Sequence, residues 1–180
     1  ARIVSTAANV DAASISRRLC FLCADNLPAE EKGIEFGTEY VVLCNPFPVL
    51  KNHLVVSARR HVPQAISDRF ADFLDLAQAL GPDYFTLYNG PACGASAPDH
   101  HHFQACSPDG VPLFDELESW PRTQVVHLDD FVAFSPRDYR VNILIAQGKK
   151  KVKIESWFAN SLNRLVELEG TTGEPMVNLI

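Results

Sequence analysis

The residues with the clearest capacity for chemistry form a run of three histidines followed closely by a glutamine. The segment Asp99-His100-His101-His102-Phe103-Gln104 alternates like a β-strand, in which every second side chain shares a face. His100, His102 and Gln104 are therefore predicted to face one way. Phe103, between the last two, is predicted to face the other way and to pack in the core. The three polar side chains form a row of imidazole, imidazole and amide, and β-propensity alone would not place three histidines here. A polar strand edge or an incidental metal-binding cluster contains the same residue types.

A loop rich in small residues leads directly into the histidines. It runs from Asn89 through Gly90-Pro91-Ala92-Cys93-Gly94-Ala95-Ser96-Ala97-Pro98. Glycine and serine allow backbone N–H groups to approach an anion closely. Next to a row of imidazoles, the loop predicts a phosphate-binding turn, whereas the same composition alone indicates only an ordinary turn.

Five cysteines lie at positions 20, 23, 44, 93 and 106. An odd number in an acidic chain of this size argues against a secreted disulfide framework. Cys20-Phe21-Leu22-Cys23 could be a redox motif, half of a metal site or a chance pair, and a thioredoxin-like site needs a βαβ context that this segment lacks. Structural zinc commonly has four Cys or His ligands, so two would have to come from elsewhere. We expect buried apolar roles for Cys44, Cys93 and Cys106, and strand or surface roles for His53 and His127.

The surrounding pattern predicts the elements that must position these residues. Strands are expected at 40–44, 52–56, 84–89, 99–106, 124–134 and 139–146. Helices are expected at about 11–19, at 67–80 with Ser67 as N-cap and Gly81 as stop, and at 155–169. Residues 148–153 are expected to form a basic turn, and the Lys149–Lys153 cluster in it is usually solvated but could meet phosphate. Hairpin-like strands interrupted by helices predict an α+β fold with a mainly antiparallel sheet and helices packed on it.

Length and composition bound the class of protein. The chain has 180 residues, 47% of them hydrophobic and 21% charged, enough for one sizeable core and unlike a disordered, collagenous or coiled-coil chain. A net charge of −6 argues against a general binder of nucleic acid. The absence of a long apolar run or a signal pattern predicts a cytoplasmic protein with no membrane partner. The start at Ala1 and the strand-like end at Ile180 predict a longer parent protein.

Several motifs in order carry a resemblance to a known family. Asn89, Gly94-Ala95-Ser96 and His100-x-His102-x-Gln104 resemble the signature of the histidine-triad (HIT) superfamily. The glutamine resembles its transferase branch, which includes galactose-1-phosphate uridylyltransferase, diadenosine tetraphosphate phosphorylase and the GDP-hexose phosphorylases; the hydrolases usually have a third histidine there. The stretch from Pro48 to His61 resembles the superfamily's strand and loop before its main helix. The resemblance covers about 20–106, and implies a HIT-like catalytic region at 1–110 with an N-terminal metal-binding segment. It also implies that 111–180 holds the remaining strands and helix and leads into a second HIT-like half.

The resemblance implies a role for each residue of the motif. His102 would attack the α-phosphorus of a nucleotide sugar or dinucleoside polyphosphate and form a nucleotidyl-histidine, with a sugar phosphate or inorganic phosphate as acceptor. Gln104 would donate to a phosphoryl oxygen, and the neighbouring His101 would be packed or solvated. Asn89 would orient the site. Other phosphate oxygens would be held by Gly94, Ala95 and Ser96.

The resemblance also completes the metal site and leaves three functions to compare. The implied ligands of a structural zinc ion are Cys20, Cys23, His61 and His100, and iron is the alternative metal. The first function is a nucleotidyltransferase or phosphorylase. The second is a nucleotide phosphohydrolase of the same superfamily, with water as acceptor. The third is a zinc-stabilised nucleotide-binding domain without catalysis. A homodimer, as in relatives, is a further expectation.

Overall fold

The structure, a computed structural model, describes residues 11–180 and divides into two compact units. The first unit combines the chain up to Pro108 with the C-terminal residues Glu169–Ile180, and the second is Asp109–Leu168. The sequence analysis placed its division at residue 110, close to the first boundary, but assigned the last residues to the second part. They return to the first unit because their strand pairs with its sheet.

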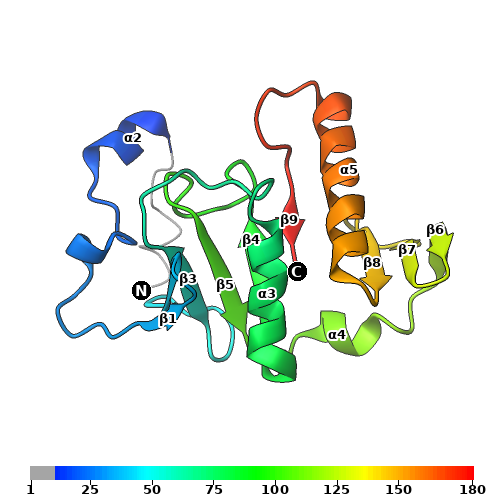
Figure 1. Cartoon of the computed structure of the whole chain (residues 1–180), viewed down its shortest axis with the longest axis horizontal. Coiled ribbons are helices and arrows are strands. Elements are labelled where there is room, and N and C mark those ends of the chain that lie inside the picture. The colour runs from blue at the N-terminus through cyan, green and yellow to red at the C-terminus, as the bar shows by residue number, and fades with distance from the viewer. Residues whose placement is uncertain (1–10) are drawn as a thin grey trace. The chain divides into compact units, whose positions relative to one another are not determined.

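The first unit is built on a six-stranded antiparallel sheet in the order β1-β2-β3-β5-β4-β9. Its strands are β1 (Ile34–Phe36), β2 (Tyr40–Cys44), β3 (Leu54–Ala58), β4 (Phe85–Asn89), β5 (His102–Cys106) and β9 (Asn178–Leu179). Its helical elements are α2 (Ala12–Arg17), α3 (Phe70–Leu80) and the 3-10 turns η1 (Ala24–Asn26) and η2 (Gly81–Asp83). Helix α3 packs on β4, and β9 pairs with β4 at the edge of the sheet, on the side away from β5 (Figure 1). The predicted α+β fold is confirmed.

The core of this unit lies on the face of the sheet that Phe103 enters, as the alternation predicted. Phe103 is fully buried, and its ring lies 5.6 Å from those of Phe73 on α3 and Tyr40 on β2. His101 shares this environment, with its ring 4.7 Å from Phe103 and 6.1 Å from Tyr88. Burying such large aromatic side chains supplies much of the free energy that fixes β5 in the sheet.

Several element boundaries differ from the prediction. Helix α3 begins at Phe70 with Arg69 as N-cap and no side-chain capping bond, so the expected cap at Ser67 was wrong, whereas the stop at Gly81 is confirmed by its φ of 62°. Strand β5 begins at His102, because residues 98–99 form a turn and the chain bends at His100. The expected burial of cysteines holds for Cys106 but not for Cys44, which is exposed.

The second unit consists of a three-stranded antiparallel sheet and two helices. Its elements are α4 (Pro112–Glu116), β6 (Arg122–Leu128), β7 (Phe131–Pro136), β8 (Ile145–Gly148) and α5 (Lys151–Glu169), which ends at the unit boundary. The strand expected at 124–134 is a hairpin, since Asp129-Asp130 favours a turn. The strand expected at 139–146 is β8, and starts later. The basic segment at 148–153 contains the start of α5, where Lys150 and Lys153 contact the Asp130 carboxylate. Among residues 11–180, no helix combines the length and apolar character that a bilayer crossing requires.

The C-terminal segment is held in the first unit by hydrogen bonds with Ile66, Tyr88 and Gly90. The Glu174 carboxylate accepts hydrogen bonds from the Tyr88 hydroxyl, at 2.5 Å, and from the Ile66 backbone N–H, at 2.6 Å. The Gly90 N–H donates to the Val177 carbonyl oxygen at 3.0 Å. A Cβ atom at Gly90 would lie only 2.5 Å from that oxygen, so the segment requires glycine here.

Gly90→Ala is therefore expected to lower the free energy of unfolding by about 1–3 kcal/mol, because the backbone must separate to admit the methyl group. Urea unfolding of the whole chain measures this difference. Gly173→Ala is the matched control, since a Cβ there meets nothing within 4 Å, and should change stability by less than about 0.5 kcal/mol. Equal free energies of unfolding for Gly90→Ala and Gly173→Ala would contradict the close packing of the C-terminal segment against Gly90.

Candidate functional site

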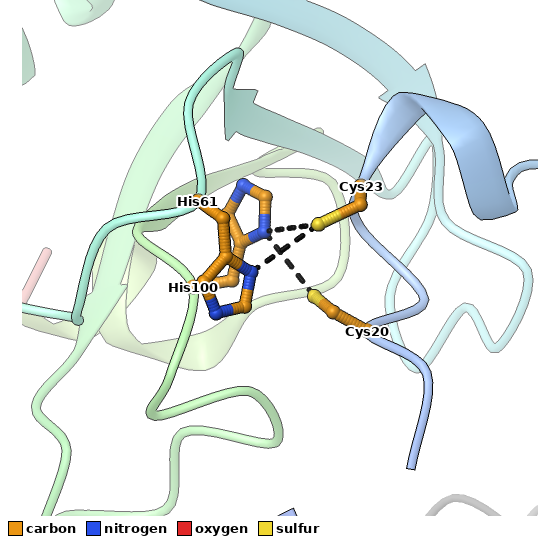
Figure 2. Close-up of side chains that lie close together, drawn as sticks. All are labelled: Cys20, Cys23, His61 and His100. Atoms are coloured by element: carbon orange, nitrogen blue, oxygen red, sulfur yellow. Dashed lines mark hydrogen bonds between the residues drawn. The ribbon is translucent and has the colours of Figure 1, made fainter. Parts of the chain in front are cut away.

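Two cysteines and two histidines from distant parts of the chain form a cluster in the first unit (Figure 2). Cys20 and Cys23 flank the turn after α2, His61 follows β3, and His100 lies in the turn before β5. The sulfur and nitrogen atoms that could act as ligands all lie within 4.8 Å of one another. The predicted grouping is therefore present, and these four residues could hold a metal ion.

The spacing of the ligand atoms fits a tetrahedral ion. The Cys20 Sγ and Cys23 Sγ atoms lie 3.2 and 3.6 Å from His100 Nδ1, and Cys23 Sγ lies 3.2 Å from His61 Nδ1. A zinc ion with ordinary Zn–S and Zn–N bonds separates its ligands by about 3.3–3.8 Å. These three distances are close to that range, and all four ligand atoms lie within 4.8 Å of one another.

His100 is held in the tautomer that a metal ligand requires. Its Nε2–H donates to the Ala58 carbonyl oxygen at 2.7 Å, and the Ser57 hydroxyl lies 3.2 Å from the same nitrogen. The lone pair of the neutral ring is therefore on Nδ1, which faces the two sulfurs. A hydrogen bond to the far nitrogen of a ligating histidine is the usual way to fix ring orientation.

The two thiols differ in acidity because they share a small space. Burial opposes ionisation of Cys20, but its hydrogen bond with His100 lowers the pKa of that thiol to about 6. Burial and the adjacent Cys20 sulfur raise the pKa of Cys23 to about 11. The protein alone therefore favours one thiolate, whereas a dication would stabilise both and displace the protons.

Asp99 extends the cluster away from the ligand atoms. Its Oδ2 lies 3.8 Å from His61 Nε2, on the opposite side of the ring from Cys23, and its Oδ1 accepts a hydrogen bond of 2.9 Å from Arg18. A carboxylate behind a histidine orients the ring and strengthens it as a ligand. The segment before Cys20 is thereby tied to the turn that carries His100.

His102 starts β5 and presents a defined nitrogen. Its Nδ1–H donates to the His100 carbonyl oxygen at 2.8 Å, so the lone pair is on Nε2. The side chain is buried, and this burial lowers the pKa of the imidazole. His102 is therefore neutral at pH 7 and has an available nucleophilic atom.

Gln64 fixes the backbone of His102 and was not singled out by the sequence analysis. Its Oε1 accepts from the His102 N–H at 2.9 Å, and its Nε2 donates to the carbonyl oxygens of His102 and Asn89. The buried amide therefore joins the start of β5 to the end of β4. Gln64 follows His61 closely in the chain, but only the folded sheet reveals its partners.

His53 is the second residue that the sequence analysis missed, because it was expected to be a strand or surface residue. The structure buries it beside Gln104, with His53 Nε2 2.7 Å from Gln104 Oε1. The Val49 N–H donates to His53 Nδ1 at 3.2 Å, and Asn45 Nδ2 lies 3.0 Å from His53 Nε2. Gln104 Nε2 in turn donates to Asn89 Oδ1 at 2.8 Å.

Gln104 retains one donor. No second acceptor contacts its Nε2 within residues 11–180, so one N–H of the amide is free. Because Gln104 and His102 are two residues apart on one strand, they share a face of the sheet. The site therefore combines a neutral nucleophile with a fixed hydrogen-bond donor.

The loop before the histidines has the predicted small residues, and its contacts are with Gly90 and Arg18. Gly94 has a φ of 95°, a conformation that favours glycine, and both Gly94 and Ser96 are exposed. Ala95 is buried, and its N–H points to the Gly90 carbonyl oxygen at 3.4 Å. The Ser96 carbonyl oxygen faces Arg18 at 3.5 Å. The structure thus places Asn89 in the Gln104 hydrogen-bond network, and the other three on the adjoining loop.

Comparison with known proteins identifies a family for the part of the chain that carries the site. Residues 1–107 match the family model described as a domain of unknown function, DUF4922. Comparisons with curated proteins and with solved structures found no match. The matched residues include the whole Cys/His cluster, His102 and Gln104, whereas the returning strand β9 lies outside them.

Proposed function

We propose that this chain, which belongs to the DUF4922 family, is a nucleotidyltransferase or phosphorylase that works through a covalent intermediate on His102. The supporting observation is the orientation of the His102 ring, whose Nδ1–H is held by the His100 carbonyl oxygen while Nε2 keeps its lone pair. Its depressed pKa maintains the neutral form at physiological pH. A neutral, oriented imidazole is suited to nucleophilic catalysis.

The first step would form a bond between His102 Nε2 and the α-phosphorus of a nucleotide sugar or dinucleoside polyphosphate. The bond from that phosphorus to the bridging oxygen would break, and the sugar phosphate or the remaining nucleotide would leave. The His100 carbonyl oxygen would stabilise the positive charge on the substituted ring through Nδ1–H. The free N–H of Gln104 would donate to a non-bridging oxygen as negative charge develops there.

The second step would return the enzyme to its starting form. An oxygen of a sugar phosphate or of inorganic phosphate would attack the same phosphorus, and the bond to His102 Nε2 would break. The released product would contain the nucleotide joined to the acceptor. Water in place of the acceptor would release a nucleoside monophosphate, which is the hydrolase alternative.

We further propose that the metal is zinc and that its role is structural. Two thiolates and two imidazoles in a tetrahedron are a set that zinc prefers. Four protein ligands leave no open position for substrate, so the ion would supply folding energy. Its position would fix Cys20 and Cys23 against the turn that leads into His102.

Intact-protein mass spectrometry tests the proposed reaction. The 180-residue chain is incubated separately with UDP-glucose, GDP-glucose, ADP-glucose and diadenosine tetraphosphate, and is quenched after seconds. We expect a mass gain of one nucleoside monophosphate with at least one donor, and its loss when a sugar phosphate or inorganic phosphate is added. Nucleotide binding by calorimetry without any mass gain or turnover would indicate the non-catalytic alternative. Nucleoside monophosphate formed without an acceptor would indicate hydrolysis.

A further inference from the structure

We infer that Asn178, in the returning strand β9, is a positioning residue for Gln104. The inference rests on the proposed function, because it concerns the amide that would face the phosphoryl group. Asn178 does not contact Gln104 directly. It acts through Asn89, and it lies outside the residues matched by the family model.

The orientation of the Asn178 amide is set by a backbone group. The Gly90 N–H lies 3.2 Å from Asn178 Oδ1 while also donating to the Val177 carbonyl oxygen. A backbone N–H can donate only to the oxygen of an amide and never to its NH2 group. Asn178 therefore presents Oδ1 to Gly90 and to the neighbouring side chain of Asn89.

This orientation determines the direction of every following hydrogen bond. Asn89 Nδ2 must donate to Asn178 Oδ1, at 3.3 Å, which leaves Asn89 Oδ1 facing the other way. That oxygen accepts from Gln104 Nε2 at 2.8 Å, so Gln104 Oε1 is turned toward His53. A chain of three amides is thus ordered from one backbone donor.

At the opposite end of the chain, donors face both nitrogens of His53. The Val49 N–H donates to His53 Nδ1 at 3.2 Å, and Asn45 Nδ2 lies 3.0 Å from His53 Nε2, which is also 2.7 Å from Gln104 Oε1. The Asn45 amide is itself oriented by the Phe47 N–H, which donates to Asn45 Oδ1. The direction of the amide chain is therefore set from the Gly90 end.

The polarity matters because a rotated Gln104 amide would present the wrong atom. In the observed orientation the free group is an N–H, which can stabilise a phosphoryl oxygen. After a half-turn of the amide, an oxygen would face that negative charge. Removing one donor to a transition-state oxyanion costs about 10²–10³-fold in rate. Removal of Asn178 loosens only one end of the chain, so we expect a smaller loss, of about tenfold.

The fastening of the segment allows Asn178 to be changed without releasing the strand. Glu174 is held by Tyr88 and Ile66, and the Val177 carbonyl oxygen is held by Gly90, all without the Asn178 side chain. Asn178→Ala should therefore keep β9 in place. Asn178→Asp retains oxygens that accept from both Gly90 and Asn89, so it should preserve the polarity. Met176→Ala is the control, since Met176 belongs to the same segment and is 64% exposed.

The test measures amide order and reaction rate on the same 180-residue chain. The two protons of the Gln104 side-chain NH2 resonate separately because rotation about the amide C–N bond is slow. In ¹⁵N spectra, both signals should have the same chemical shifts in the wild type, the Asn178→Asp variant and the control. In Asn178→Ala, the proton that faces Asn89 should move upfield as its hydrogen bond weakens. The rate of nucleotide labelling, with UDP-glucose, GDP-glucose, ADP-glucose or diadenosine tetraphosphate as donor, should fall about tenfold in Asn178→Ala and less than about threefold in Asn178→Asp.

The outcomes distinguish the positioning role of Asn178 from the proposed function. Labelling of the wild type with unchanged Gln104 signals and rate in Asn178→Ala would overturn the positioning role alone. A slower rate that Asn178→Asp does not rescue would also overturn it, since that pattern indicates general damage. Absence of labelling in the wild type with all four donors would overturn the proposed function, and the positioning role with it.

Discussion

Cys20→Ala is expected to remove the bound metal and to lower the melting temperature by about 6–12 °C, the equivalent of about 3 kcal/mol for a chain of this size. Cys20 is buried, and its sulfur lies 3.2 Å from His100 Nδ1. Without it, three candidate ligands remain, and the segment before η1 loses one of its contacts with the turn that precedes β5. Structural zinc is worth far more than this in small zinc domains, but here the six-stranded sheet supports most of the fold.

Cys44→Ala is the matched control, because Cys44 is an exposed thiol in β2 and outside the cluster. It should keep one metal ion per chain and the wild-type melting temperature to within about 1 °C. Elemental analysis by mass spectrometry gives the metal and its stoichiometry, and thermal unfolding with and without a chelator gives its energetic effect. A wild-type melting temperature that a chelator does not change would contradict the presence of a structural ion.

The sequence was most informative where chemistry depends on local spacing. The Cys20–Cys23 pair is visible as a motif, and the alternation around His102 predicted that Phe103 would enter the core. The partners of the cysteines came from the family resemblance, since nothing local links them to His61 or to His100. Strand period and motif order are properties of short segments, so they can be recognised without knowledge of the sheet order.

The residues that the sequence missed depend on contacts between distant segments. His53 and Gln104 are separated by 51 residues, Gln64 and His102 by 38, and Asn89 and Asn178 by 89. A lone histidine or amide in a strand has many ordinary roles, so its type alone carries no signal. The order β3-β5-β4-β9 brings these side chains together, and that order includes a strand that returns after the whole second unit. The turn at 98–99 was missed for a related reason, because the expected strand at 99–106 rested on local alternation alone.

His102→Gly is expected to abolish nucleotide labelling, with a fall in transfer rate of at least about 10³-fold. The substitution removes the only atom of this side chain that could bond to phosphorus, while Gln64 still holds the backbone of the strand. The metal should stay bound, since His102 is not one of the four ligands. Labelling by intact mass, metal content and thermal unfolding are measured on the same samples.

His101 provides the sharpest control, because it is the histidine adjacent to His102 in the run of three. It is fully buried, and within residues 11–180 neither ring nitrogen has a hydrogen-bond partner. Burial, and then the charge of Arg69, lowers the pKa of His101 to about 3, so the ring is neutral. A buried polar group without partners destabilises the fold, and an apolar side chain of similar size removes that cost.

His101→Leu should therefore label at a rate within about threefold of the wild type and melt at the same temperature or higher. His102→Gly and His101→Leu change adjacent residues. We expect the first to abolish labelling, and the second to keep labelling and to maintain or raise the melting temperature. Loss of labelling in His101→Leu, together with retained labelling in His102→Gly, would contradict the proposal, because the nucleophile would then be His101 and not His102. That result would also contradict the buried aromatic environment of His101, in which no substrate phosphate could reach the ring.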